Sequence, residues 1–426
     1  MKIQKIIERL LRLHPKSIDL SLGRIKRLLN DLNNPESKLT NSVQVVGTNG
    51  KHSFCTTLRE IYETAGYKVN LNISPSIRKF NERYYFSGKY ISDEHLCDLL
   101  TEVEKINKGK NITFHEFICA CFFLEASRNI ADLNILESGL FFRLDASNVL
   151  KKNIASVVMP IGIDHKDFLK EGTIDEIVYE KCSHLLNNSK IFVSEQEKNT
   201  LLKIKKNISK NSSQKFIFGE DYKYEKIFNG FMYKDKDKQI SLPKPNLSGD
   251  FQISNITTAI CAAKNINEFR ITDSHIKKSI IKIKSEGRLQ YITEGKLINY
   301  VSKNNIILID GAHNPLAALA INKYLKNLRK EKKIIMVLGM MANKEHKEFI
   351  QVFKNIVHSI IALDIPNQLN FIKKENLSKI VQSCGIPVKS ENSIEVALKN
   401  IAKENDDAVI FCTGSLYFIG EILNLN

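Results

Sequence analysis

VQVVGTNGKHS, residues 43–53, places an apolar run directly before a glycine-rich turn and a lysine. A strand that ends in glycine and leads through a short turn into a helix points backbone N–H groups and the positive helix end at an anion. Lys51 adds a cation for the terminal phosphates of a nucleotide. The common phosphate-loop pattern G-x-x-x-x-G-K-[ST] is not met, because Val45 and His52 occupy two of its positions. The stretch therefore predicts a phosphate loop of a shorter form, GTNGK.

The composition is that of a globular protein with two domains. The chain has 426 residues, and a single core stops growing at roughly 250 to 300 residues. It contains no apolar run of 18 residues, and charges interrupt the N-terminal stretch MKIQKIIERLLRLHPK. These features exclude a helical membrane span and a signal peptide, so we expect a cytoplasmic protein without a membrane partner.

The charge and cysteine patterns exclude two further classes. The net charge is +16, but the lysines are scattered and no RNA-binding signature or zinc finger is present, so no nucleic-acid partner is expected. The eight cysteines lie singly in apolar segments without a C-x-x-C pair. They are interpreted as reduced, mostly buried thiols rather than metal ligands.

Strand-like apolar runs alternate with segments of helical period, which indicates parallel sheets covered by helices. Between residues 200 and 245 the pattern changes to short lysine-rich pieces, which predicts a small antiparallel appendage. We predict an α/β protein with a phosphate-loop domain on a mostly parallel sheet at 1–284 and a smaller Rossmann-like α/β domain at 285–426. The expected strands include 42–47, 68–74, 131–138, 154–162, 190–195, 305–311 and 407–414, and the expected helices include 51–66 and 114–128.

Ten motifs along the chain make it resemble the folylpolyglutamate synthase/dihydrofolate synthase family of the Mur ligase superfamily. GTNGK is the short loop that this superfamily uses, and the order and spacing of the motifs carry the resemblance almost from end to end. The other motifs are LHPKSIDLSLGRIKRLLNDLNNP (13–35), NISPSIRKFNERYYFSGKYIS (72–92), ILESGLFFRLDASNV (135–149), GIDHKDFLKEGTIDEIVYEK (162–181), LSGDFQISN (247–255), EGRLQ (286–290), LIDGAHNP (308–315), MANKE (341–345) and FCTGSLY (411–417).

The resemblance implies an ATP-dependent ligase that adds L-glutamate to dihydropteroate, to folates or to both. Such an enzyme phosphorylates a carboxylate with ATP and lets an amine attack the acyl phosphate, so it must gather several negative groups. ATP is the co-substrate, two Mg²⁺ ions are implied, and the family precedent is a monomer. The bifunctional form is expected, although single-activity forms share the motifs.

The resemblance also assigns roles to individual residues. Helix caps or surface polar groups are the alternative for each, but three strand ends that all carry metal-type groups favour a metal site. The implied ATP contacts are Gly47, Thr48, Asn49, Gly50, Lys51, Ser53, Gln252, Asn255, Arg288 and Asp310; the Mg²⁺ ligands are Ser74, Glu137 and His165; the catalytic residues are Lys51, His313 and Lys181, which is carbamylated in the family; the substrate contacts are Arg83, Phe141, Phe142, His313 and Ser415.

Two positions depart from the family pattern. His52 replaces a glycine, which costs little if the position has helical backbone angles. Phe141 and Phe142 replace two glycines, and their side chains bring apolar area that must be buried or stacked. They could wall the pterin pocket, fill a gap or block the site, and our hypothesis is that they reshape the folate end.

Two other functions stay open at this point. The first is a different Mur-type ligase, such as a peptidoglycan enzyme, although a phosphate loop that begins at Gly47 leaves no room for the N-terminal domain of those enzymes. The second is a catalytically silent nucleotide-binding protein descended from the ligases. His52 and the Phe pair support the silent form, whereas Lys51, Glu137 and the other site residues argue against it.

Overall fold

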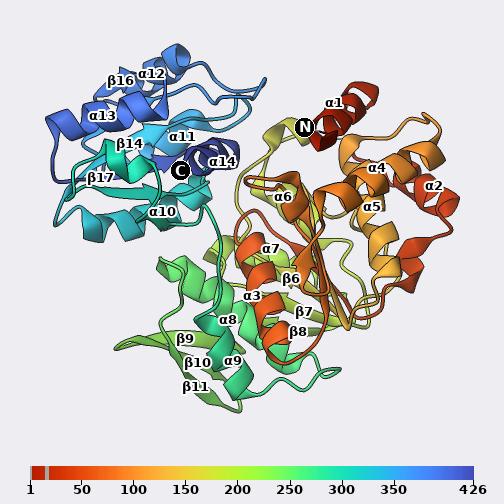
Figure 1. Ribbon diagram of the computed structural model, residues 1–426. Coiled ribbons are helices and arrows are strands. Elements are labelled where there is room, and N and C mark those ends of the chain that lie inside the picture. The colour runs from red at the N-terminus through yellow and green to blue at the C-terminus, as the bar shows by residue number, and fades with distance from the viewer. Residues whose placement is uncertain (1, 15–18) are drawn as a thin grey trace. The chain divides into compact units, whose positions relative to one another are not determined.

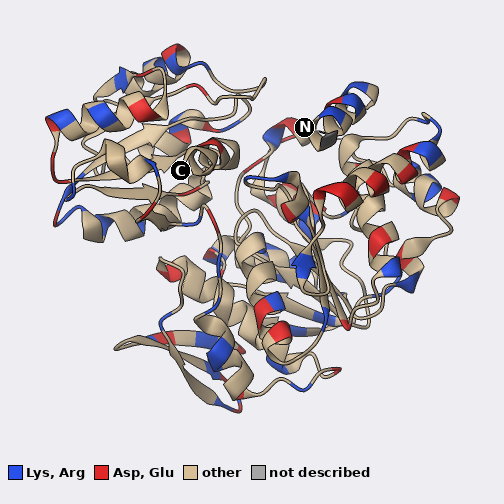
Figure 2. Cartoon of the chain, in the orientation of Figure 1, with Lys and Arg blue, Asp and Glu red and all other residues tan. Residues whose placement is uncertain are grey.

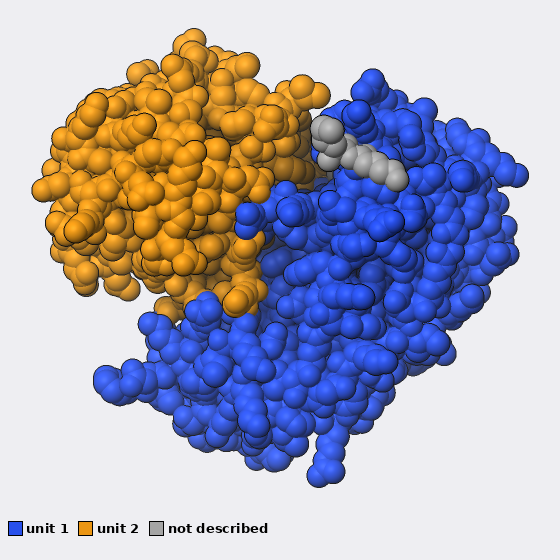
Figure 3. All heavy atoms as spheres, in the orientation of Figure 1, with its two compact units in different colours: residues 1–161, 174–246, 253–283 blue, residues 162–173, 247–252, 284–426 orange. Residues whose placement is uncertain are grey.

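The computed structural model describes residues 2–14 and 19–426, which form two compact units. Unit 1 comprises residues 1–161, 174–246 and 253–283, and unit 2 comprises residues 162–173, 247–252 and 284–426 (Figure 3). The units therefore differ from a simple division of the chain at residue 284. Two short internal segments, 162–173 and 247–252, group with the C-terminal part of the chain.

Unit 1 is built on an eight-stranded sheet with the order β4-β3-β2-β5-β1-β6-β7-β8 (Figure 1). The strands from β2 to β8 in this order are parallel, and β3 and β4 add an antiparallel edge. The central strands are buried on both faces, as their continuous apolar runs predict. Their bounds are β1 Ser42–Val46, β2 Val69–Asn72, β3 Tyr84–Phe86, β4 Lys89–Tyr90, β5 Leu133–Glu137, β6 Ala155–Val158, β7 Lys190–Val193 and β8 Gln214–Ile217.

The helices of unit 1 follow from local sequence signals. Thr113 and Glu116 form a reciprocal capping box at the start of α5, and Gly66, with φ of 92°, follows the end of α3. The helix α3 packs against β1, β2, β5 and α9. The helices are α1 Lys2–Leu13, α2 Gly23–Asp31, α3 Lys51–Thr64, α4 Asp93–Asn107, α5 Phe114–Arg128, α6 Ile174–Cys182, α7 Lys198–Asn207, α8 Asp250–Asn265 and α9 Asp273–Ile280, with 3₁₀ turns at Pro35–Lys38 and Phe80–Arg83.

A separate three-stranded antiparallel sheet lies beside α9, with the order β11-β10-β9. Its strands are β9 Tyr222–Ile227, β10 Gly230–Asp235 and β11 Gln239–Pro243. The predicted appendage exists, but its predicted start near residue 200 was wrong. Residues 198–207 form α7 and residues 214–217 form β8, which extends the parallel sheet. The lysines of α7 hid its helical period, because only Thr200 and Ile204 are buried there.

Unit 2 contains a six-stranded sheet with the order β12-β13-β17-β14-β15-β16. All neighbours are parallel except β12, which pairs antiparallel with β13. The predicted α/β fold class is confirmed in both units. The elements are β12 Gln290–Ile292, β13 Ile306–Ile309, β14 Lys333–Leu338, β15 Ser359–Ala362, β16 Val388–Ser390, β17 Ala408–Thr413, α10 Pro315–Leu328, α11 His346–Gln351, α12 Lys374–Ser383, α13 Ile394–Glu404 and α14 Leu416–Leu425, with 3₁₀ turns at Lys166–Phe168 and Leu297–Tyr300.

The distribution of charged side chains and the burial of the cysteines match what the sequence predicted. Lys and Arg are spread over many helices and strands and are interspersed with Asp and Glu (Figure 2). All eight cysteines are buried and free, as predicted. Among the described residues, no helix is both long and apolar enough to cross a membrane.

Candidate active site

The phosphate loop lies between β1 and α3, and its two glycines are required by close packing. Gly47 has φ of 149°, and a Cβ there would come within 2.7 Å of the Met159 Cβ. Gly50 has φ of 78°, and a Cβ would come within 2.5 Å of the Asn255 Oδ1. The N–H groups of Thr48 and Asn49 donate to the Pro160 carbonyl at 2.8 and 3.2 Å. The loop is therefore held against the segment that follows β6, and a side chain at either glycine would displace it.

His52 does not break the loop. It lies in the first turn of α3, which begins at Lys51, and it has helical backbone angles rather than a positive φ. The first N–H groups of a helix have no intrahelical partner and form the anion-binding end of the element. The expectation that a side chain is tolerated at position 52 is confirmed for the backbone.

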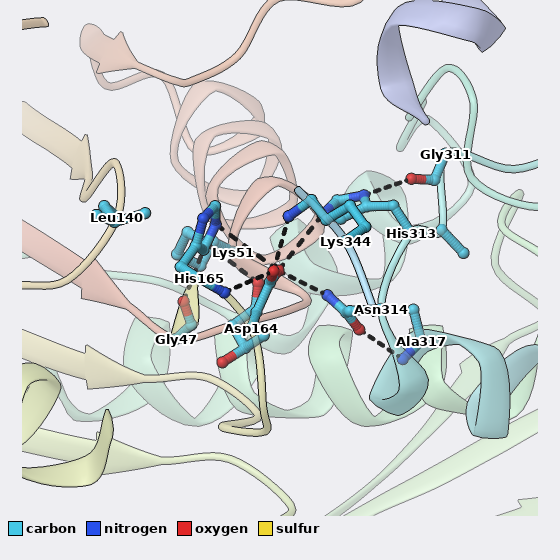
Figure 4. A network of polar contacts seen from close by, with 12 residues as sticks. Gly47, Lys51, Leu140, Asp164, His165, Gly311, His313, Asn314, Ala317 and Lys344 are labelled. Carbon is cyan, nitrogen blue, oxygen red and sulfur yellow. Dashed lines mark hydrogen bonds and ion pairs between the residues drawn. The ribbon is translucent and has the colours of Figure 1, made fainter. Parts of the chain in front are cut away.

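Two lysines meet at one backbone oxygen of the loop. The Nζ atoms of Lys51 and Lys181 each lie 3.0 Å from the Gly47 carbonyl oxygen. Lys181 is buried and also donates to the Leu140 carbonyl at 2.7 Å. The predicted burial of Lys181 is confirmed. Its ammonium group joins the loop after β1 to the loop after β5 (Figure 4 labels Gly47, Lys51 and Leu140).

A carboxylate lies beside the phosphate loop, as the sequence predicted. Glu137 ends β5, is 4% exposed, and has its Oε1 4.0 Å from the Lys51 Nζ. The Ser74 N–H donates to the Glu137 Oε2 at 3.4 Å, so these two predicted metal ligands lie side by side. Carboxylate and hydroxyl oxygens are ligands that suit Mg²⁺, which also keeps water or phosphate oxygens in its shell.

The third predicted metal ligand, His165, belongs to unit 2. Among the described residues, no group of three or more His, Cys, Asp or Glu side chains is arranged to hold a metal ion. The ligand set Ser74, Glu137 and His165 stays a prediction.

The loop after β5 contains the Phe pair and is tightly packed. Phe141 and Phe142 are 1% and 0% exposed. The Lys181 Nζ lies 5.3 Å from the centre of the Phe141 ring, a cation–π distance. Arg143 pairs with Glu180 through two guanidinium nitrogens, the shorter contact being 2.8 Å. Of the three roles considered for the Phe pair, these contacts support the filling of a gap, because neither ring has a free face.

Asp145 anchors the same loop from within. Its Oδ2 accepts the N–H groups of Gly139 and Leu140 at 3.0 and 3.2 Å, and the His115 Nε2 lies 3.5 Å away. Burial alone raises the pKa of the Asp145 carboxyl, but the His115 ring and the Ser147 hydroxyl and N–H lower it to about 2. The ionised form of Asp145 therefore stabilises the position of this loop.

The predicted nucleotide residues of unit 2 surround the turn after β13. The Asp310 carboxylate is buried and accepts the N–H groups of Leu289 and Ala312, both at 2.8 Å. Burial raises the pKa of Asp310 and the nearby Arg288 guanidinium opposes this rise. Arg288 and Asp310 are thus brought together, and their contact with a nucleotide stays a prediction.

The remaining predicted residues lie in separate elements. Ser415 caps α14 by accepting the Tyr417 N–H at 3.2 Å. The Arg83 guanidinium lies 4.9 Å from the centre of the Phe80 ring. Gln252 and Asn255 are both buried in the first turns of α8. Their assigned roles toward substrate or adenine stay predictions.

A charged cluster around Asp164 in unit 2 was missed by the sequence reasoning (Figure 4). The Asp164 Oδ1 accepts from the Lys344 Nζ at 2.7 Å, and its Oδ2 accepts from the Asn314 Nδ2 at 3.0 Å. The His313 Nε2 lies 3.5 Å from the same Oδ2. Burial raises the pKa of Asp164, but His313, His165 and Lys344 hold it well below its usual value. The available signal was the acidic residue directly before His165 in the segment that follows β6.

The comparisons with known proteins define the class to which this fold and site belong. Residues 45–263, more than half of the chain, match the family model of the Mur ligase middle domain. Residues 287–416 match the Mur ligase, glutamate ligase domain. The chain belongs to the Mur ligase family.

The similar proteins within that family are named as dihydrofolate synthases, as folylpolyglutamate synthases or as both. The dihydrofolate synthase/folylpolyglutamate synthase of Bacillus subtilis is 28% identical over 424 residues, which cover 94% of each chain. The structure of E. coli FolC in complex with DHPP and ADP has a TM-score of 0.86 and 22% identity, and covers 99% of this chain and 97% of that chain. A bifunctional folylpolyglutamate synthase/dihydrofolate synthase with Mn, AMPPNP and L-glutamate bound has a TM-score of 0.83 and 22% identity, and covers 98% of this chain and 96% of that chain. The sequence resemblance to this enzyme family is confirmed.

The Asp145 contacts predict a defined pH dependence of stability. Because the folded-state pKa of about 2 lies below the usual value of 3.8, the ionised carboxylate stabilises the fold above about pH 4. This stabilisation is lost as the pH falls through about 2. Between pH 5 and pH 2 the free energy of unfolding of the wild type should therefore fall by about 2 kcal/mol more than that of Asp145→Asn, measured by urea unfolding. The matched control is Asp98→Asn, an exposed position in unit 1, which should follow the wild type. Parallel curves for the wild type and Asp145→Asn would refute the assignment.

Proposed function

We propose that the chain is an ATP-dependent ligase that joins L-glutamate to dihydropteroate, to folates or to both through an acyl phosphate. The observation that carries the proposal is the loop from Gly47 to Lys51 at the end of β1, with the Glu137 carboxylate 4.0 Å from the Lys51 ammonium. This arrangement pairs a phosphate-binding loop with an oxygen ligand for a divalent cation. The names of the similar enzymes support glutamate and a pteroate or folate as the other substrates.

The residues of unit 1 suit the phosphoryl-transfer half of this reaction. The first N–H groups of α3 bind the phosphates and Lys51 neutralises part of their charge. Glu137 and Ser74, together with His165, would hold Mg²⁺, which neutralises phosphate charge when bound. The similar structure with Mn and AMPPNP bound supports a divalent cation and ATP. Ser53 and the remaining loop residues complete the proposed ATP contacts.

The residues of unit 2 suit the amide-forming half. Arg288 and Asp310 are proposed to contact the nucleotide, and His313 and Ser415 to lie near the incoming glutamate. Gln252 and Asn255 are proposed for the adenine, and Arg83 for the folate side. The Phe141–Phe142 pair is proposed to shape the folate end by filling space beneath the loop after β5, because both rings are buried.

Carbamylation of Lys181 is a separate part of the proposal. Two partners of the Lys181 ammonium are the Gly47 and Leu140 carbonyl oxygens, which accept hydrogen bonds but repel an anionic carbamate. A carbamylated Lys181 keeps a single N–H, so at least one of the Gly47 and Leu140 carbonyls would have to lose its hydrogen bond. Incubation with ¹³C-bicarbonate should give a carbamate ¹³C resonance that disappears in Lys181→Met. A spectrum without this resonance at saturating bicarbonate would remove carbamylation from the account.

An assay of phosphate release distinguishes a ligase from a catalytically silent nucleotide-binding protein. With ATP, Mg²⁺ and L-glutamate, release should depend on added dihydropteroate or reduced folate. Lys51→Ala should lower the rate on the order of 100-fold or more, because it removes a cation aimed at the transferred phosphoryl group. His52→Gly should keep the rate within about twofold, because the position is helical with either residue.

Two outcomes would contradict the proposal. Phosphate release that ignores both acceptors would favour a nucleotide-binding protein without ligase activity. A gain in rate on His52→Gly as large as the loss on Lys51→Ala would show that the histidine obstructs the phosphate loop.

A further inference from the structure

Asp164 is a buried carboxylate with an unusually complete set of donors. It is 6% exposed and lies in the segment 162–173 of unit 2. Its Oδ1 accepts the Lys344 Nζ at 2.7 Å and the His165 backbone N–H at 2.9 Å. Its Oδ2 accepts the Asn314 Nδ2 at 3.0 Å, with the His313 Nε2 at 3.5 Å. Both oxygens are therefore satisfied, which a buried carboxylate requires.

The donors come from three segments that are far apart in the sequence. Asp164 and His165 lie after β6, His313 and Asn314 lie between β13 and α10, and Lys344 lies between β14 and α11. Figure 4 shows these side chains converging on the Asp164 carboxylate. A second ion pair, between the Lys166 Nζ and the Glu345 Oε2 at 3.0 Å, joins the first and third segments.

The Asp164 carboxylate determines the orientation of the neighbouring Asn314 amide. An ionised carboxylate only accepts hydrogen bonds, so Asn314 must turn its NH₂ group toward Asp164. The Asn314 Oδ1 then points toward α10 and caps it by accepting the Ala317 N–H at 2.9 Å. Asp164 thus fixes the amide orientation on which the start of α10 depends.

The His313 ring is fixed in the same way. Its Nδ1 lies 2.9 Å from the Gly311 carbonyl oxygen, which can only accept, so the Nδ1 carries a proton. The opposite nitrogen, Nε2, faces Asp164. The ring is held at both ends, and its plane follows from these two partners.

We propose that Asp164 is a positioning residue of the ligase reaction, which fixes the Lys344 ammonium group and the His313 ring, proposed above to lie near the glutamate, and joins them to the segment that carries His165. The inference rests on the proposed function for the reaction, and on the described contacts for the positioning. Asp164 acts through its neighbours and does not itself touch substrate. Its effect should therefore appear in the use of glutamate and in the state of His313, rather than in the binding of nucleotide.

The test compares Asp164→Asn with Asp167→Asn. The first keeps the shape but removes the charge and half of the acceptor capacity, and the second changes an exposed carboxyl of the same segment. In Asp164→Asn, kcat/KM for glutamate should fall at least roughly tenfold, since misplaced groups cost about this much or more. The KM for glutamate should rise, while the KM for ATP should stay within about twofold. A loss of folded protein would lower kcat but leave both KM values unchanged. Asp167→Asn should match the wild type in both.

A spectroscopic measurement tests the positioning without any turnover. In protein labelled with ¹⁵N-histidine, the His313 ring signals are assigned by their loss in His313→Gln. The wild type should show a protonated Nδ1, and the Nε2 resonance should move in Asp164→Asn but not in Asp167→Asn. Lys344→Met removes the 2.7 Å partner while keeping the carboxylate. It should move the same resonance and raise the KM for glutamate, and it replaces Asp164→Asn if that variant does not fold.

The outcomes separate the two proposals. A wild type without ligase activity would refute the proposed function, while the His313 spectrum would still decide whether Asp164 positions the ring. An active wild type whose glutamate kinetics and His313 signals are unchanged in both Asp164→Asn and Lys344→Met would overturn the inference. The double variant gives a further test. If its loss in kcat/KM for glutamate, expressed as a free energy, equals the sum of the losses of the two single variants, Asp164 and Lys344 do not act as a pair, and the inference is overturned.

Discussion

The Gly47 carbonyl oxygen accepts two ammonium groups, from Lys51 and Lys181, each at 3.0 Å. A carbonyl has two lone pairs, so both are used, and the position of this one oxygen fixes the start of α3 and the end of α6 relative to β1. Lys181 extends the link to Leu140 in the loop after β5. No side chain fits at position 47, because a Cβ would meet Met159. The phosphate loop, the Phe pair and the Glu137 strand end therefore depend on the same few atoms.

Unit 2 uses a similar arrangement, in which one carboxylate accepts from several donors. The Asp164 carboxylate orients Asn314, His313 and Lys344, as the Gly47 carbonyl orients its two lysines. In both cases the central acceptor is buried, so each hydrogen bond is stronger than in water and an unpaired partner would be costly. The side chains assigned to chemistry are thus held by contacts within their own unit before any substrate binds. Such preorganisation is what a reaction through a short-lived, reactive intermediate requires.

The sequence predicted the parts of the fold that depend on local signals. The strand before GTNGK, the helix after it and the helix at 114–128 follow from apolar runs and glycines, and all are present. The helix at 198–207 was missed because only Thr200 and Ile204 are buried in it, so its apolar period is weak. Asp164 was missed because its importance depends on Asn314 and Lys344, which are 150 and 180 positions away. The double lysine contact at Gly47 could not be predicted either, since no local pattern places Lys181 beside residue 47.

The most direct test of the acyl-phosphate reaction traces an oxygen atom from the carboxylate of the acceptor substrate to the released phosphate. Dihydropteroate or a reduced folate labelled with ¹⁸O in its carboxylate is incubated with the protein, ATP, Mg²⁺ and L-glutamate, and the released phosphate is analysed by mass spectrometry. If the carboxylate is activated as an acyl phosphate, amine attack on the acyl carbon breaks the bond between that carbon and the bridging oxygen. We therefore expect one ¹⁸O atom in the released phosphate for each amide formed. Amide formation with unlabelled phosphate, or phosphate release without amide, would contradict it.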